Sequence, residues 1–126
     1  MDIDKIYRHA VFSISPDLSL TEAARRMRAN DVSSLMVLDD EKFVGIVTER
    51  DLVRSIAAGD LPATAVVADH MTDQPIAIGP DTGIREAAAE MLELEVRHLP
   101  VMEEGQVVGM VSLRDLLSVV VGNADL

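Results

Sequence analysis

A stripe of apolar residues at helical spacing is the first regular pattern in the chain. Its members fall at i, i+3, i+4 and i+7 and are Leu20, Ala23, Ala24 and Met27. This spacing places them on one face and predicts an amphipathic helix. Ser19 and Glu22 have the spacing of a capping box, so we expect the helix to begin just after Ser19. A short apolar segment, residues 10–15, precedes the helix and ends in a Pro16-Asp17 turn.

Shorter apolar runs follow, and they have the length of strands. Residues 35–38 and 43–47 flank the acidic turn 39–42, a pattern that predicts a β-hairpin. We expect a second helix to start after Thr48 and to stop at Gly59, because glycine commonly ends helices. The predicted unit therefore has the order β-α-β-β-α.

The whole pattern is written twice. Residues 14–53 recur as residues 78–117 at a constant offset of 64 (80 − 16, Pro80 against Pro16). Ordinary amino-acid usage would give roughly two or three identities by accident, far fewer than this pair of segments has. Residues that recur include Ile14, Pro16, Asp17, Glu22, Ala23, Ala24, Met27, Gly45, Val47, Arg50, Asp51 and Leu52. The sequence thus predicts two related halves and two related sites.

Composition narrows the class of protein. Each half of this 126-residue chain is near the lower size limit for a core of its own, so we expect the halves to pack on each other. A formal charge of −11 repels phosphate backbones and disfavours nucleic-acid binding. The absence of cysteine excludes disulfides and thiolate sites. With no basic leader pattern and no apolar stretch of membrane-spanning length, we expect a cytoplasmic protein that does not insert into membranes.

Short motifs in both copies resemble the cystathionine-β-synthase (CBS) domain. In the second copy they are Ile78-x-Pro80-Asp81, Glu86-Ala87-x-x-x-Met91, Leu99-Pro100-Val101 and Gly109-x-Val111-Ser112-x-x-Asp115. The first copy has Gly45-Ile46-Val47-Thr48-Glu49-Arg50-Asp51-Leu52, and Asp69-x-Met71-Thr72 resembles the usual lead-in to a repeat. Their order, spacing and duplication carry the resemblance, which covers nearly the whole chain.

The resemblance implies an α+β fold of two tandem β-α-β-β-α repeats related by pseudo-two-fold symmetry, with small three-stranded sheets packed against helices. The first repeat would span residues 8–65 and the second residues 72–126. It also implies two clefts between the repeats that hold adenine nucleotides or related adenosyl compounds, such as AMP, ADP, ATP, NAD, S-adenosylmethionine or coenzyme A. Such proteins are regulatory sensors and often homodimers, so we expect a homodimer that acts on a separate, unknown regulated protein.

Thr48-x-x-Asp51 and Ser112-x-x-Asp115 stand where a strand is predicted to turn into a helix. A hydroxyl at the N-cap with a carboxylate at N3 caps free amides and contributes on the order of 1 kcal/mol. The same groups suit a ligand, since the helix N-terminus faces a phosphate and the carboxylate accepts hydrogen bonds from both ribose hydroxyls. With the family resemblance, both roles together are favoured.

The other candidate residues surround these two motifs. By resemblance, Arg97 and His98 would reach phosphates, whereas the first copy has the uncharged pair Ser33-Ser34, so the two clefts should differ. Thr72, Pro75 and Ile76 match a segment that contacts ribose and adenine, but the positions 64 earlier are Arg8, Val11 and Phe12 and lack a hydroxyl. The full set of nucleotide-binding candidates is Thr48, Arg50, Asp51, Thr72, Pro75, Ile76, Ile78, Arg97, His98, Ser112, Arg114 and Asp115, with Ser33 and Ser34 as weaker ones.

No pattern in the chain predicts catalysis or a resident metal. The acidic turns lack the spacing of a calcium loop, and His9, His70 and His98 share no ligand spacing. Phosphate-binding Gly-Lys loops, nucleophile elbows and dinucleotide fingerprints are absent from the sequence. We therefore expect no catalytic residues, no metal site and no catalytic cofactor. An interaction scaffold that docks on a separately encoded enzyme or transporter, without a small-molecule ligand, remains the alternative.

Overall fold

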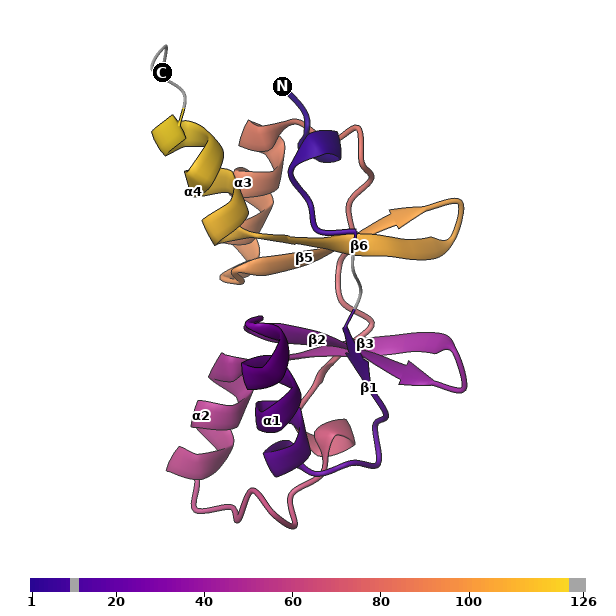
Figure 1. Cartoon of the computed structure of the whole chain (residues 1–126), viewed down its shortest axis with the longest axis vertical. Helices are drawn as coiled ribbons and strands as arrows, with labels where there is room; N and C mark the ends of the chain where they lie inside the picture. Colours follow the sequence, from indigo (N-terminus) through magenta and orange to yellow (C-terminus); the bar gives the residue numbers. More distant parts are fainter. Residues whose placement is uncertain (10–11, 123–126) are drawn as a thin grey trace. The chain divides into compact units, whose positions relative to one another are not determined.

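The computed structural model describes residues 1–9 and 12–122, and these form two compact units (Figure 1). One unit is Phe12–Pro75, and the other combines the described residues of 1–11 with those of 76–126. The amino-terminal segment therefore packs with the second repeat and not with the first. Each unit is described by itself below.

In the unit Phe12–Pro75, two helices lie side by side against one sheet (Figure 1). Its elements are β1 (Ser13–Ile14), α1 (Leu20–Asn30), β2 (Ser34–Asp39), β3 (Lys42–Thr48), α2 (Glu49–Ala57), the 3-10 helix η2 (Val67–Asp69) and β4 (Thr72–Asp73). The strand order is β1-β2-β3-β4, with β1 parallel to β2 and the other pairs antiparallel. The fourth strand is thus supplied by the segment that leads into the second repeat.

The other unit repeats this plan. Its elements are η1 (Ile3–Lys5), α3 (Ile84–Leu94), β5 (His98–Glu103), β6 (Gln106–Ser112) and α4 (Leu113–Gly122). Strands β5 and β6 form an antiparallel hairpin, and two isolated bridges extend it. Ile78 pairs in parallel with Val101, and Arg8 pairs in antiparallel fashion with Met110. Arg8 therefore occupies the place on β6 that Thr72, opposite Ile46, has on β3.

The segments that precede the two repeats are also alike. We call residues 3–8 and 67–72 the lead-in segments. Each contains a 3-10 helix, and the helices η1 and η2 start 64 residues apart (67 − 3). Their first residues, Ile3 and Val67, are completely buried, each in the core of its own unit. The duplication thus extends further toward the amino terminus than the sequence pattern indicated.

Glycine is required where a lead-in segment crosses a sheet. A Cβ on Gly45 would lie 2.6 Å from the Thr72 carbonyl oxygen and 2.9 Å from Met71 Sδ. The equivalent Gly109 faces Arg8 and Tyr7, and a Cβ there would lie 2.5 Å from Tyr7 Cδ2 and closer still to the Arg8 carbonyl oxygen. Both strands thus need a residue without a side chain at this point.

Each unit has one hydrophobic core between its helices and its sheet. In Phe12–Pro75 the buried members are Ile14, Leu20, Ala23, Met27, Leu35, Val37, Val47 and Val67. In the other unit they are Ile3, Tyr7, Ala87, Met91, Leu99, Val101, Val111 and Leu116. Some of the residues that recur at the offset of 64 thus fill equivalent buried places in the two cores, namely Ala23 and Ala87, Met27 and Met91, Leu35 and Leu99, Val37 and Val101, and Val47 and Val111. The predicted apolar stripe on α1 is confirmed for three of its residues, whereas Ala24 is exposed.

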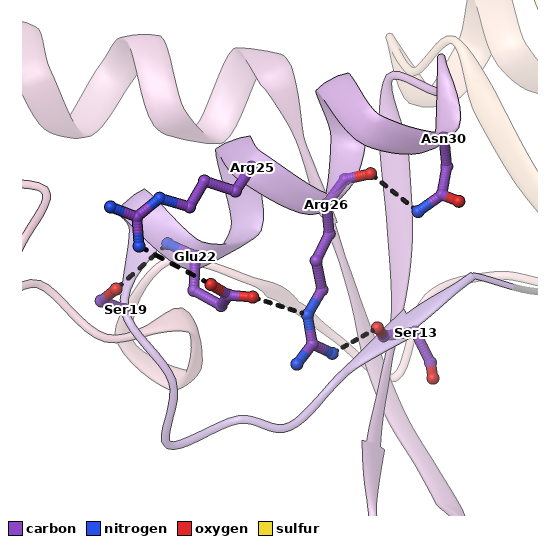
Figure 2. A network of polar contacts seen from close by, with 6 residues as sticks. All are labelled: Ser13, Ser19, Glu22, Arg25, Arg26 and Asn30. Carbon is purple, nitrogen blue, oxygen red and sulfur yellow. Dashed lines mark hydrogen bonds and ion pairs between the residues drawn. The ribbon is translucent and has the colours of Figure 1, made fainter.

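The start of α1 differs from the predicted capping box. Ser19 Oγ accepts a hydrogen bond from Glu22 N at 3.1 Å, as expected of an N-cap. The Glu22 carboxylate does not turn back toward the cap but lies 3.1 Å from Arg26 Nε and 3.9 Å from an Arg25 nitrogen (Figure 2). Arg26 also donates to the Ser13 carbonyl at 2.9 Å and so ties α1 to β1 (Figure 2). The two nearby arginines thus compete for the carboxylate that the cap would use.

The predicted α+β class and the two β-α-β-β-α repeats are confirmed. The hairpins expected at residues 35–47 and their repeat are β2-β3 and β5-β6. The strand number differs from the expected three per sheet. One sheet gains a fourth strand, β4, from a lead-in segment, whereas among the described residues the other has two strands, β5 and β6, with isolated bridges at Ile78 and Arg8. Residues 10–11 of the expected first strand, and residues 123–126 of the expected second repeat, lie outside the described residues. Within the described part of the chain, no helix has the length and hydropathy needed to cross a membrane.

Candidate functional site

The amino terminus of α2 carries a complete capping box. Thr48 N donates to Asp51 Oδ2 at 2.8 Å, and Asp51 N donates to Thr48 Oγ1 at 3.4 Å. The Thr48 hydroxyl also donates to Asp51 Oδ2, at 3.0 Å. Of the two carboxylate oxygens of Asp51, these contacts use only Oδ2. The capping role predicted for these residues is confirmed, and Oδ1 of Asp51 is left to accept further hydrogen bonds.

The amino terminus of α4 has nearly the same geometry. Ser112 N donates to Asp115 Oδ2 at 2.8 Å, and Asp115 N donates to Ser112 Oγ at 3.1 Å. The exposed fraction of the Asp115 side chain is 12%, so this carboxylate is held close to the surface with restricted access to water. Its position follows from the local sequence, because a hydroxyl and a carboxylate three residues apart fix each other at a helix start.

The ends of strands β2 and β5 lie beside these helix starts. Glu49 N donates to the Ser33 carbonyl at 3.1 Å, and Leu113 N donates to the Arg97 carbonyl at 2.8 Å. In the hairpin registers Ser34 pairs with Thr48, and His98 pairs with Ser112. The sequence placed both residue pairs near the helix starts only by resemblance. The hydrogen bonds and strand registers show that both pairs do lie beside the helix starts.

The lead-in segments complete two groups of residues, one in each unit. We call Ser33, Ser34, Thr48, Asp51 and Thr72 the α2 junction, and Arg97, His98, Ser112, Asp115 and Arg8 the α4 junction. Thr72 joins the first group because it pairs with Ile46, two residues before Thr48. Arg8 joins the second because its Nε lies 3.6 Å from Asp115 Oδ1. Within its unit Thr72 therefore accompanies Thr48 and Asp51.

Arg8 was missed as a candidate. It was noted only as a position without a hydroxyl, since the offset of 64 pairs it with Thr72. The signal that could have found it is its charge in a strongly acidic chain, together with the crossing of the lead-in segment over the other repeat. That crossing is a non-local feature, and neither periodicity nor motif spacing reports it.

The remaining candidates lie around these groups. Arg50 and Arg114 are exposed residues in the first turns of α2 and α4. Ile76 is exposed, whereas Ile78 packs against the core of its unit and its N–H donates to the Pro100 carbonyl at 3.0 Å. Pro75 is half-buried at the end of the other unit. Ile78 therefore has a structural role that is independent of any ligand.

Tyr7 precedes Arg8 in the chain and is a buried member of the core in the unit that contains the α4 junction. Burial raises the pKa of its hydroxyl above the ordinary value, and the negative charges of Asp4 and Glu103 raise it further. Its ring lies 4.2 Å, centroid to centroid, from the ring of His9. Tyr7 is therefore a neutral, packed side chain at physiological pH and not a source of charge in the site.

Metal-binding groups of at least three His, Cys, Asp or Glu side chains do not occur among residues 1–9 and 12–122. The acidic hairpin turns Asp39-Asp40-Glu41 and Glu103-Glu104 are exposed. At the two junctions, hydroxyls, carboxylates and helix amides lie together.

Comparison with known proteins identifies both repeats. The family model of the CBS domain matches residues 3–58 and again residues 67–122. An uncharacterized 17.7 kDa protein from Acidianus ambivalens is 34% identical over 116 residues, which cover 90% of this chain and 70% of that protein. An inosine-5'-monophosphate dehydrogenase from Korarchaeum cryptofilum is 39% identical over 107 residues, 84% of this chain but only 21% of that enzyme. The match to the enzyme therefore covers only a small part of its length.

Solved structures show the same fold. An uncharacterized conserved protein from Pyrococcus horikoshii is 32% identical and has a TM-score of 0.86, with 94% of this chain and 91% of that chain covered. The CBS domain pair of protein MJ0100, solved in complex with 5'-methylthioadenosine and S-adenosyl-L-methionine, has a TM-score of 0.86 at 22% identity and covers 97% of both chains. At that identity the second likeness establishes the fold alone.

Proposed function

Because this chain belongs to the CBS domain family, with both repeats matched, we propose that it is a regulatory module that binds an adenine nucleotide or a related adenosyl compound. The observation that carries the proposal is the way Asp51 and Asp115 are held. Each carboxylate caps its helix through Oδ2, and the cap hydrogen bonds do not use Oδ1. A fixed carboxylate whose second oxygen is not used by the cap is suited to accept hydrogen bonds from ribose hydroxyls.

The chemistry of a nucleotide fits the rest of each junction. Amide groups at a helix amino terminus and the partial positive charge there favour a phosphate. In the α4 junction Arg97 adds a cationic residue that can form paired hydrogen bonds with phosphate oxygens. In the α2 junction Ser33 and Ser34 offer hydroxyls only, so affinity for charged ligands should differ between the two. Regulation requires that the ligand prefer one conformation or assembly of the protein by a few kcal/mol.

The first test is a thermal-shift panel of AMP, ADP, ATP, NAD, S-adenosylmethionine and coenzyme A. A ligand at about one hundred times its dissociation constant adds roughly 2.7 kcal/mol to the free energy of unfolding, which raises Tm by several degrees in a chain of this size. We expect at least one compound to do so. The binding of two adenosyl compounds by the MJ0100 pair supports the choice of ligand class. Unchanged melting curves with all six compounds would refute the proposal.

We further propose a homodimer built on α2 and α4. Both helices expose apolar residues at equivalent repeat positions, Val53 and Ile56 on α2 and Leu117 and Val120 on α4. Such pairs are typical of surfaces that another chain covers. We expect the wild type to have twice the chain mass in light scattering and Leu117→Lys to shift it to the monomer. Leu92→Lys, on the exposed side of α3, is the matched control and should leave the dimer intact. A monomeric wild type would refute the dimer.

The same exposed residues favour one alternative, an interaction scaffold that docks on a separate protein. The two functions differ in their need for Asp51 and Asp115. A scaffold uses these residues only as helix caps, so their substitution would affect stability alone. A scaffold without a small-molecule ligand would also give unchanged melting curves in the thermal-shift panel, whereas a sensor would not.

A further inference from the structure

The two junctions differ in the lead-in residue beside the aspartate that is proposed to bind the ligand. In the α4 junction Arg8 Nε lies 3.6 Å from Asp115 Oδ1, the oxygen that the helix cap does not use. In the α2 junction the equivalent lead-in position is Thr72, whose side chain has no charge. The two carboxylates are otherwise held alike by their caps.

The ion pair between Arg8 and Asp115 should weaken the binding of an uncharged nucleoside more than that of a nucleotide. Asp115 has an exposed side-chain fraction of 12%, so its charge depends on nearby partners more than a fully hydrated one would. Ribose hydroxyls that bind Oδ1 must share it with Arg8 or displace the guanidinium. A neutral nucleoside has no anionic group that could bind the displaced Arg8 guanidinium. A nucleotide offers its phosphate, to which a guanidinium binds with paired, charge-assisted hydrogen bonds.

We propose that Arg8 is a specificity residue that makes the α4 junction select phosphorylated adenosyl ligands, whereas the α2 junction, with Thr72, accepts uncharged ones as well. This inference rests on the proposed function and adds the ligand class of each junction. Arg8 is well placed for the role, since its backbone is fixed by two hydrogen bonds to Met110 while its side chain remains about half exposed. The guanidinium can therefore move from the carboxylate to a phosphate without any change in the strand pairing.

Other charged residues near Asp115 explain a difference in ligand selectivity between the two junctions less well than Arg8 does. Arg114 has an exact counterpart, Arg50, in the α2 junction. Arg97 replaces Ser33 and also favours phosphate, but no ion pair between it and Asp115 occurs in the described part of the chain. Arg97 can thus add affinity for a nucleotide, whereas only Arg8 also opposes the binding of an uncharged nucleoside. The experiment must therefore compare two ligands that differ only in the phosphate.

The test is a pair of titrations with AMP and adenosine, followed by the backbone amide signals of Asp51 and Asp115 in two-dimensional NMR spectra. Each amide reports the dissociation constant of its own junction. In the wild type we expect the preference for AMP over adenosine to be stronger at Asp115 than at Asp51. Arg8→Thr should reduce that preference at Asp115 about tenfold, the loss of one charge-assisted contact. Thr72→Arg should raise it at Asp51 by a similar factor, and Arg8→Lys should retain most of it at Asp115.

The outcomes separate the inference from the function on which it rests. If neither ligand moves either amide, the proposed function and the inference both fail. If both ligands bind but Arg8→Thr leaves the AMP-to-adenosine ratio at Asp115 unchanged, only the inference fails. If Arg8→Thr does not give a folded spectrum, Thr72→Arg decides the question, because an unaltered ratio at Asp51 would overturn the role given to this position.

Discussion

Gly109→Ala is expected to lower the free energy of unfolding by about 3 kcal/mol, at the upper end of the cost of overpacking. The added methyl group would overlap the Tyr7 ring and the Arg8 carbonyl oxygen. Neither neighbour can yield easily, since Tyr7 is buried in the core and Arg8 is held by hydrogen bonds to Met110 in both directions. Urea unfolding followed by circular dichroism measures the change.

Gly122→Ala is the matched control for this substitution. A Cβ at Gly122 meets no atom within 4 Å, so we expect unchanged or slightly higher stability. If Gly109→Ala unfolded at the same urea concentration as the wild type, the close approach of Tyr7 and Arg8 to Gly109 would be contradicted. Gly45→Ala, which meets Thr72 and Met71, should reproduce the effect in the other unit.

Asp115→Asn is expected to weaken nucleotide binding at the α4 junction about ten- to hundredfold, the range for losing a hydrogen bond to a charged group. The same change should cost only about 1 kcal/mol of stability, because the asparagine oxygen can still accept from Ser112 N. Isothermal titration calorimetry gives the affinity, and urea unfolding gives the stability. The expected affinity loss corresponds to about 1.4 to 2.7 kcal/mol of binding free energy and should therefore exceed the stability loss.

Asp2→Asn is the control for the loss of one negative charge at a helix cap. Asp2 accepts from Asp4 N at 3.1 Å and belongs to the same unit, but it lies outside the α4 junction. We expect it to leave nucleotide affinity unchanged. If Asp115→Asn lost stability and affinity in equal measure, helix capping alone would explain Asp115, and the binding role would be rejected.

Local features of the fold could be predicted from the sequence because each depends on neighbouring residues. The hairpins follow from short apolar runs around a turn, and the starts of α2 and α4 follow from a hydroxyl and a carboxylate three residues apart. The capping box at Ser19 was only half correct, since Arg25 and Arg26 draw Glu22 away from the cap. Competition of this kind depends on side-chain direction, which spacing alone does not determine.

The parts that could not be predicted are non-local. The lead-in segments cross to the sheet of the other repeat, so Arg8 meets Asp115 although 107 residues separate them in the chain (115 − 8). The same crossing explains why Gly45 and Gly109 recur, a fact that the sequence alone could report but not interpret. Candidate residues near each helix start were therefore found by motif, whereas their distribution between the two junctions required the fold.

The central claim is that Asp51 and Asp115 bind the ribose hydroxyls of an adenosyl ligand. Calorimetric titration of AMP and of 2′,3′-dideoxy-AMP tests it most directly, in the wild type and in the Asp51→Asn, Asp115→Asn double variant. We predict that the wild type prefers AMP by at least about tenfold and that the double variant binds the two compounds nearly equally. An equal preference for AMP in both proteins would contradict the claim.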